Sequence, residues 1–237
     1  MTWILVFALG VRVLWLGRLK IILLVLLPAL IGAAPSRTLE ERLLAAALAQ
    51  PRAWYAPGVL TPGALETQSA YEERIKLAVS ALSRATMRAR GDGTYAVVPP
   101  DWFWHRKTLV VAVLAHWYEE SRLAYEVHAG LDHPVWTQDV GRARCLGQLH
   151  VGLVPAQEWA ALAGLDEQAT QRCAAWTARA LTRMALYCGK GRRGADKLDD
   201  ILLPMFSAMG GGGCSPTVAG RAKLVRFAKM WREVERR

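Results

Sequence analysis

Residues 109–115 are apolar at every position. A helix that is apolar all round lies inside a protein, so this pattern predicts a buried helix. At about 100° per residue, Glu120 falls on the same stripe as Val113 and Trp117, where a leucine would be expected. Glu119 is rotated away from that stripe. The predicted helix therefore ends with a carboxyl group on its apolar face.

A carboxyl group in that position has a clear chemical use. An unpaired, ionised carboxyl group is costly to bury, so it tends to stay protonated and its pKa rises. A raised pKa is what a general acid near neutral pH requires, which makes Glu120 a candidate catalytic acid. His116, one turn earlier, is placed to hydrogen-bond Glu120 or to be satisfied by the backbone. The alternative is a helix end at which Glu120 reaches water or pairs with a basic neighbour.

Most of the remaining chain carries helical patterns separated by loops rich in proline and glycine. Thr38 and Glu41 have the spacing of a capping box, and Asp101 and Asp166 precede helical patterns as N-caps. A short strand is predicted at 95–98. The further helices are predicted at 36–50, 68–90, 155–162, 166–187 and 198–209.

The last predicted helix begins after Ser215-Pro216 and runs through Trp231. Its apolar positions are expected to face the core, and its basic positions to face water or to touch wall polymer or membrane. These apolar positions are Val218, Ala222, Val225, Ala228 and Met230.

Residues 1–34 are strongly apolar, and Arg12, Arg18 and Lys20 are their only charges. The apolar run 21–33 is short for a membrane span but typical of a signal-peptide core, with small residues after it that suit a peptidase. A retained membrane anchor and a buried helix are the alternatives. A signal or an anchor would place the rest of the chain outside the cytoplasm, because the basic residues should stay inside.

Composition and charge limit the kinds of protein and partner that are possible. The 237 residues are 53% hydrophobic and 21% charged, which excludes a mainly disordered chain. A net charge of +10 suits an anionic partner such as nucleic acid, a lipid surface or cell-wall glycan with its peptide carboxylates. The sequence shows no helix-turn-helix, zinc-finger or RNA-binding signature, so we expect no nucleic-acid partner.

The chain has four cysteines, all after the apolar leader, an even count that is compatible with two disulfides in an oxidising compartment. Of the three pairings that four cysteines allow, we favour Cys145 with Cys173 and Cys188 with Cys214. Free buried thiols are the alternative. No Cys-x-x-Cys or His-x-x-x-His pair occurs, so no metal site is expected.

Two short motifs carry a family resemblance. Glu120-Ser121, a spacer, and then Gly147-Gln148 after an apolar residue resemble the soluble lytic transglycosylase and goose-type lysozyme families. In those families a Glu-Ser pair ends a buried helix, and a segment such as Gly-Leu-Met-Gln follows a variable loop. The resemblance implies that Glu120 is the catalytic acid/base and that Gln148 lines a sugar cleft, with Ser121 and Gly147 beside them.

The resemblance covers residues 101–237 and has one marked departure. The families continue with an Ala-Tyr-Asn segment that places a tyrosine near the acid. Here the corresponding region has no tyrosine or asparagine and instead carries the glycine run Gly210–Gly213. That run is expected at the edge of the cleft, where glycine allows close approach of a ligand, or it is simply a hinge.

Other residues near the motifs are candidates for substrate contact. His150 follows Gln148 by two positions and points either into the cleft or away from it. Asp139 is the best-placed second carboxylate, either as a base or as a nucleophile, although the resembled transglycosylases use one glutamate; an exposed loop aspartate is the alternative. Aromatic rings that stack on sugars or pack in the core are available at Trp102, Trp104 and Trp136.

Together these features predict a mainly α, lysozyme-like fold with very little strand, preceded by a signal or anchor at 1–34. Residues 35–100 form an N-terminal helical part, and 101–237 form the catalytic core. We expect a periplasmic or secreted protein, with or without attachment to the inner membrane, that cleaves peptidoglycan glycan strands without a cofactor. The alternatives are an inactive lysozyme-like wall-binding or scaffold protein of an envelope machine, and a membrane-anchored adaptor without glycan contact.

Overall fold

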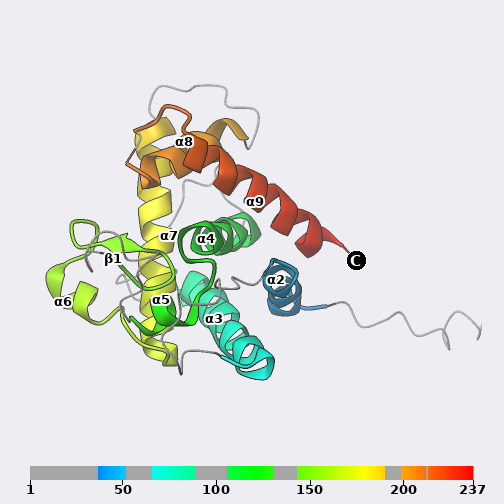
Figure 1. The fold of residues 1–237 in the computed structure, drawn as a ribbon. Coiled ribbons are helices and arrows are strands. Elements are labelled where there is room, and N and C mark those ends of the chain that lie inside the picture. Colours follow the sequence, from blue (N-terminus) through cyan, green and yellow to red (C-terminus); the bar gives the residue numbers. More distant parts are fainter. Residues whose placement is uncertain are drawn as a thin grey trace, which may run out of the picture. The chain divides into compact units, whose positions relative to one another are not determined.

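The computed structural model describes residues 37–51, 66–88, 106–130, 143–189, 199–211 and 213–236. Within these ranges the chain is mainly helical with very little strand, which confirms the predicted fold class at that level. Residues 38–236 form one unit by their internal contacts, and the description that follows concerns this unit. Its elements are α2 (Leu39–Leu48), α3 (Gln68–Arg88), α4 (Arg106–Ser121), α5 (Tyr125–Ala129), β1 (Ala143–Arg144), β2 (Leu149–His150), α6 (Ala156–Ala160), α7 (Glu167–Gly189), α8 (Asp199–Met209) and α9 (Val218–Glu235) (Figure 1).

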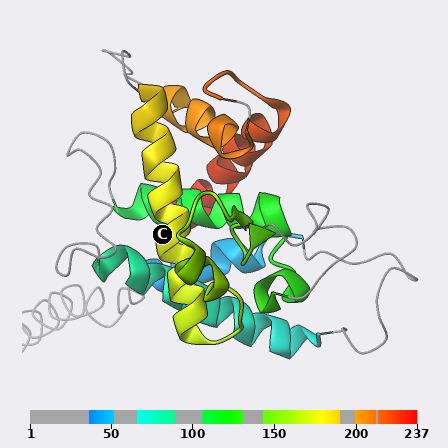
Figure 2. The same cartoon turned by 90° about the vertical axis from the view of Figure 1, so that its left-hand side faces the viewer.

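The buried helix predicted from the apolar run is α4. From Val110 to Trp117 every residue is at most 1% exposed. The helix contacts α2, α3, α7 and α9, so apolar neighbours surround it. Figure 2 shows α4 (green) crossing behind α7 (yellow), with α8 and α9 on one side and α3 on the other. A helix enclosed in this way has no need of a polar face, which explains the uniform apolar run.

The other predicted helices are present, with ends that differ by a few residues. The capping box of α2 is confirmed: Glu41 N donates to Thr38 Oγ1 over 3.2 Å, and Thr38 N donates to the Glu41 carboxylate over 2.7 Å. Asp166 caps α7 by accepting from Ala169 N. The N-cap of α9 is Thr217, two residues beyond the predicted Ser215. The predicted strand at 95–98 and the cap at Asp101 lie outside the described residues.

The buried face predicted for α9 is wrong except at Met230, which is fully buried. Val218 and Val225 are 88% and 70% exposed. The face that packs inward is offset from them and carries a lysine; its buried residues are Gly220, Lys223, Phe227, Met230 and Val234. Gly220 fixes this orientation, because a Cβ there would lie 2.2 Å from Ser207 Oγ on α8. The close approach of α8 and α9 therefore decides which face of α9 is buried.

Two disulfides cross-link the second half of the chain. Cys145 in the β1–β2 turn pairs with Cys173 on α7, and Cys188 at the end of α7 pairs with Cys214 before α9. These are the two pairs favoured from the sequence, and no described cysteine is free. Such bonds are compatible with an oxidising, extracytoplasmic compartment. The helices of the described part include none with the length and hydropathy of a membrane span, and the leader 1–34 lies outside that part.

Candidate functional site

A pocket of about 520 Å³ brings together segments that are far apart in the sequence. One side is polar and comes from the end of α4 and the β1–β2 hairpin. The other side is apolar and comes from the segment after β2 and from α7 and α8. The residues that line the pocket are His116, Glu120, Gly147, Gln148, His150, Leu153, Met184, Ala208, Met209, Gly210 and Gly211. The sequence-predicted candidates Glu120, Gln148, Gly147, His150 and His116 therefore meet in one place.

The two glutamates at the end of α4 have different surroundings, but Glu119 is the more buried, with 9% of its side chain exposed against 28% for Glu120, which the stripe analysis did not predict. Glu119 pairs with Arg226 of α9 over 2.8 Å and with Arg122 over 3.0 Å. Arg226 also donates to Gln50 Oε1, so this cluster joins α4 and α9 to the end of α2. Glu120 instead lines the pocket, and 28% of its side chain is exposed.

Glu120 is held by a buried cation that the sequence did not point to. Its Oε1 atom forms an ion pair with Lys223 Nζ and lies 3.9 Å from His116 Nδ1. Burial is the largest influence on the carboxyl group and raises its pKa, but His116, Lys223 and His150 together outweigh burial and lower the pKa below its ordinary value. The predicted raised pKa is therefore wrong. The alternative, a pair with a basic neighbour, describes Glu120 correctly.

His116 is neutral and has a defined tautomer. Its Nε2 atom lies 3.1 Å from the Gly147 carbonyl oxygen. A carbonyl oxygen only accepts, so Nε2 carries the proton and Nδ1 presents a lone pair toward Glu120. Burial, followed by the charge of Lys223, lowers the pKa of His116 to about 4. Within the described part of the chain, Nδ1 has no hydrogen-bond partner.

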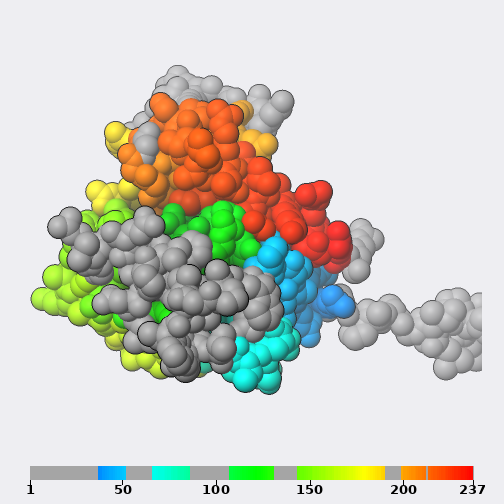
Figure 3. Space-filling view, in the orientation of Figure 1, coloured from blue at the N-terminus to red at the C-terminus, as the bar shows by residue number. Residues whose placement is uncertain are grey.

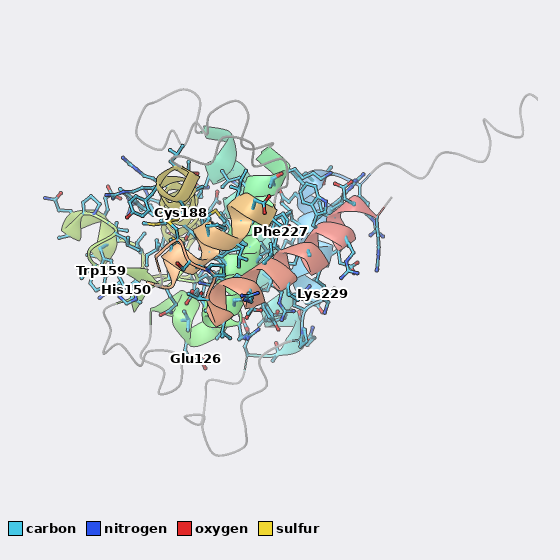
Figure 4. The ribbon with its side chains drawn as sticks, turned by 90° about the horizontal axis from the view of Figure 1, so that it is seen from above. Glu126, His150, Trp159, Cys188, Phe227 and Lys229 are labelled. Atoms are coloured by element: carbon cyan, nitrogen blue, oxygen red, sulfur yellow. A yellow bond between two sulfur atoms is a disulfide. The ribbon has the colours of Figure 1, made fainter. Side chains whose placement is uncertain are left out.

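The β1–β2 hairpin is held in place against α7. Ala143 pairs with His150 and Arg144 with Leu149, and Cys145 and Gln148 take positive φ angles of 60° and 45° in the turn between them. The disulfide from Cys145 to Cys173 fastens this turn to α7. At the far end, Trp159 of α6 donates to Leu149 O over 3.0 Å and holds β2 beside α6, where Figure 4 shows His150 near Trp159.

Close packing under the turn leaves room only for glycine at position 147. A Cβ there would lie 2.3 Å from Thr177 Oγ1 and 3.2 Å from Trp117 Nε1. The same Thr177 hydroxyl accepts from Trp117 Nε1 and donates to Cys173 O. The turn is thus seated directly on α4 and α7, which sets the positions of the Gly147 carbonyl and the Gln148 side chain.

Part of the apolar side of the pocket comes from the end of α8 and the glycines that follow it. Gly210 and Gly211 border the pocket, as expected for the glycine run, and Gly211 has a φ of 77° that favours glycine. The disulfide from Cys188 to Cys214 ties this segment to the end of α7. Figure 3 shows the segment (orange) on the surface beside α9 (red). Each disulfide therefore secures one wall of the pocket.

Not every candidate residue belongs to the pocket. Ser121 is fully buried: its hydroxyl donates to Trp117 O over 2.7 Å and accepts from Leu123 N over 3.2 Å, which shapes the end of α4. The expectation that Ser121 contacts substrate is therefore wrong. Asp139 and the tryptophans at 102, 104 and 136 lie outside the described residues. In the part of the chain that the structure describes, no three His, Cys, Asp or Glu residues are grouped to hold a metal.

Comparison with protein-family models, with curated proteins and with solved structures finds no match. The case for a function therefore depends on the residues themselves. The pocket offers a carboxyl group, an amide side chain, a neutral histidine and an apolar side. Such a set can bind a polar, uncharged ligand and can exchange one proton with it.

Proposed function

We propose that the protein is an extracytoplasmic enzyme that cleaves the glycan strands of peptidoglycan, with Glu120 as its single acid/base. One observation carries this proposal: Glu120 and Gln148, the two residues singled out by the family motifs, line the same pocket. They lie 28 positions apart in the sequence, and nothing in this spacing forces them together. Gly210 and Gly211 border the same pocket. They stand in the region where the resembled families place their tyrosine, and this adds support.

In this proposal the chemistry needs only one carboxyl group. Protonated Glu120 gives its proton to the oxygen that links N-acetylmuramic acid to N-acetylglucosamine, and the bond from that oxygen to the muramoyl C1 breaks. The resulting carboxylate then takes a proton from the muramoyl 6-hydroxyl, whose oxygen bonds to C1 and gives a 1,6-anhydro product. In the hydrolytic variant, water replaces the 6-hydroxyl. Either way Glu120 ends the cycle protonated.

The setting suits this substrate. Peptidoglycan carries carboxylates on its peptides, and a chain with a net charge of +10 is attracted to it. The two disulfides favour an oxidising compartment, which is where cell wall is found. The apolar leader at 1–34 has the pattern of a signal peptide or a membrane anchor. Either one supports export of the rest of the chain.

A second candidate is a glycan-binding scaffold protein without activity. The ion pair between Glu120 and Lys223 favours it, because a carboxylate held ionised has no proton to donate. The pocket would then bind sugar through Gln148 and its neighbours without cleaving the strand.

The test compares Glu120→Gln with Glu119→Gln on purified peptidoglycan. Both changes replace one carboxylate by an amide of the same size on adjacent residues, but only Glu120 lines the pocket. We expect Glu120→Gln to lower the rate of glycan release by at least about 100-fold, within the range of general acid catalysis, and Glu119→Gln to retain activity. Equal rates for Glu120→Gln and wild type would reject the catalytic role. Binding of wild-type protein to the wall without any release would favour the scaffold.

A further inference from the structure

Lys223 occupies a position that normally belongs to an apolar residue. It lies on the inward face of α9 in line with Phe227, Met230 and Val234, and only 3% of its side chain is exposed. Figure 4 shows α9 with Phe227 and Lys229 labelled along it. Lysine is almost never buried to this extent unless it is paired, because its ammonium group loses its hydration. The burial of Lys223 is therefore tied to its partner, Glu120.

The two carboxylate oxygens of Glu120 have different surroundings. Lys223 Nζ and His116 Nδ1 both approach Oε1. These are the shortest approaches of the two groups, and 28% of the Glu120 side chain is exposed at the pocket. We therefore take Oε2 as the oxygen that meets a ligand.

We propose that Lys223 is the positioning residue of this site: its buried ion pair holds Oε1 of Glu120 so that Oε2 faces the ligand. This inference rests on the proposed function. A bound glycan displaces water from Oε2, and desolvation favours the protonated carboxyl group. The acid therefore forms when substrate is present.

The charged groups around Glu120 single out Lys223 for this role. The titratable side chains that face the carboxyl group are His116 from α4, His150 from β2 and Lys223 from α9. His116 is neutral near pH 7, and the exposed His150 is the smallest of these influences on the pKa of Glu120. The residues of α7 and α8 that line the pocket are not titratable. His116 and Lys223 both lower the pKa of Glu120, and near pH 7, where His116 is neutral, Lys223 is the buried charge beside the carboxyl group.

The pH profile tests this role in a way that loss of packing cannot mimic. Cleavage requires protonated Glu120, so activity should fall as the pH rises through the titration of that carboxyl group. Removing the ammonium group leaves burial as the main influence and moves this falling limb to higher pH. An opposite charge at contact distance is worth about 1–3 pKa units, so we expect Lys223→Met to move the limb by about one unit or more.

Three variants of the full chain separate charge from packing. Lys223→Met keeps the length of the side chain without its charge, Lys223→Arg keeps a charge, and Lys229→Met removes a charge from the same helix away from the pocket. The limb should move upward in Lys223→Met and stay within about half a unit of wild type in the other two. An unmoved limb in Lys223→Met, with cleavage intact, would overturn the role of Lys223.

Carbon-13 NMR titration of the Glu120 carboxyl group gives the same answer without relying on activity. In the wild-type protein the pKa of Glu120 should lie below its ordinary value of 4.5, and in Lys223→Met it should rise. A wild-type pKa above 4.5 would overturn the proposal even if Lys223→Met does not fold. Absence of cleavage in every variant, together with the expected titrations, would reject the proposed enzyme function and leave the role of Lys223 standing.

Discussion

Replacing Gly147 by alanine tests whether the pocket depends on the seating of the β1–β2 turn. The added Cβ would lie 2.3 Å from Thr177 Oγ1, a distance that real contacts do not show. Thr177 cannot simply turn aside, because its hydroxyl accepts from Trp117 Nε1 over 3.1 Å and donates to Cys173 O over 2.8 Å. Either the hydroxyl gives up these bonds or the turn lifts away from α7.

The magnitude follows from those bonds. Leaving the buried Trp117 Nε1 without its acceptor costs about 1–3 kcal/mol, and the bond to Cys173 O adds about 1 kcal/mol. Against this, alanine lowers the entropy of the unfolded chain and gains about 0.4–1 kcal/mol. We expect Gly147→Ala to lower the free energy of unfolding by about 2–3 kcal/mol. In a chain of this size that is a fall in Tm of about 5–10 °C.

Thermal unfolding of matched variants measures this effect. Gly152→Ala is the control, because it makes the same change just after β2 where a Cβ meets nothing within 4 Å. Its Tm should equal or slightly exceed that of wild type. In a Thr177→Ala background the clashing hydroxyl is gone, so Gly147→Ala should cost less than it does alone. Equal Tm values for Gly147→Ala and Gly152→Ala would refute the packing argument.

Three further predictions follow from the structure. Each disulfide closes a segment with a sequence separation of 28 or 26 residues, so loss of either should cost about 3.5 kcal/mol, and thiol titration of the denatured, non-reduced chain should find no free cysteine. Burial lowers the pKa of His116 to about 4 and that of His128 to about 3 in the folded protein. Between these values and pH 6.5 the unfolded chain therefore binds more protons than the folded chain. Stability should therefore fall on acidification below pH 6.5, by up to about 1.4 kcal/mol per pH unit for each histidine, as denaturant midpoints from pH 7 to 4 will show. A reporter fused after Thr38 should be active only outside the cytoplasm, and cytoplasmic activity alone would contradict export.

The uniform apolar run of α4 made its position in the core predictable, but helical phase did not reveal that Glu119 is more buried than Glu120. The meeting of Glu120 with Gln148 was expected only because of the family motifs. What the sequence could not give was the sign of the Glu120 pKa shift. Burial and a nearby cation act in opposite directions, and the outcome depends on which side chain of a distant helix approaches the carboxyl group.

Lys223 was not predicted because α9 carries two stripes, each of which could form the buried face of the helix. Apolar residues such as Val218 and Val225 suggested one buried face, but they are exposed. The other stripe, Lys223, Phe227, Met230 and Val234, has the regular spacing of a core face and was masked by its lysine. A lysine within an otherwise apolar stripe is the signal that could have pointed to a buried partner. The face finally chosen depends on the contact of Gly220 with α8, which helical phase does not reveal.

Short elements were also beyond the sequence. α5 lies in the spacer between the two family motifs, and its histidine, His128, is buried between Arg74 and Thr170. The two-residue strands β1 and β2 are too short for alternation to show. We attribute α5 to tertiary contacts, and the β1–β2 hairpin to tertiary contacts and the disulfide at Cys145, rather than to local propensity.

Mass spectrometry of purified peptidoglycan after incubation with the protein tests the central claim most directly. The account predicts soluble muropeptides that wild-type protein releases and Glu120→Gln does not. A terminal 1,6-anhydro-muramoyl group would identify the intramolecular route, and a reducing muramoyl end, heavier by one water, would identify hydrolysis. Intact glycan strands after incubation with folded wild-type protein, at any pH from 4 to 8, would contradict the claim that this pocket cleaves the cell wall.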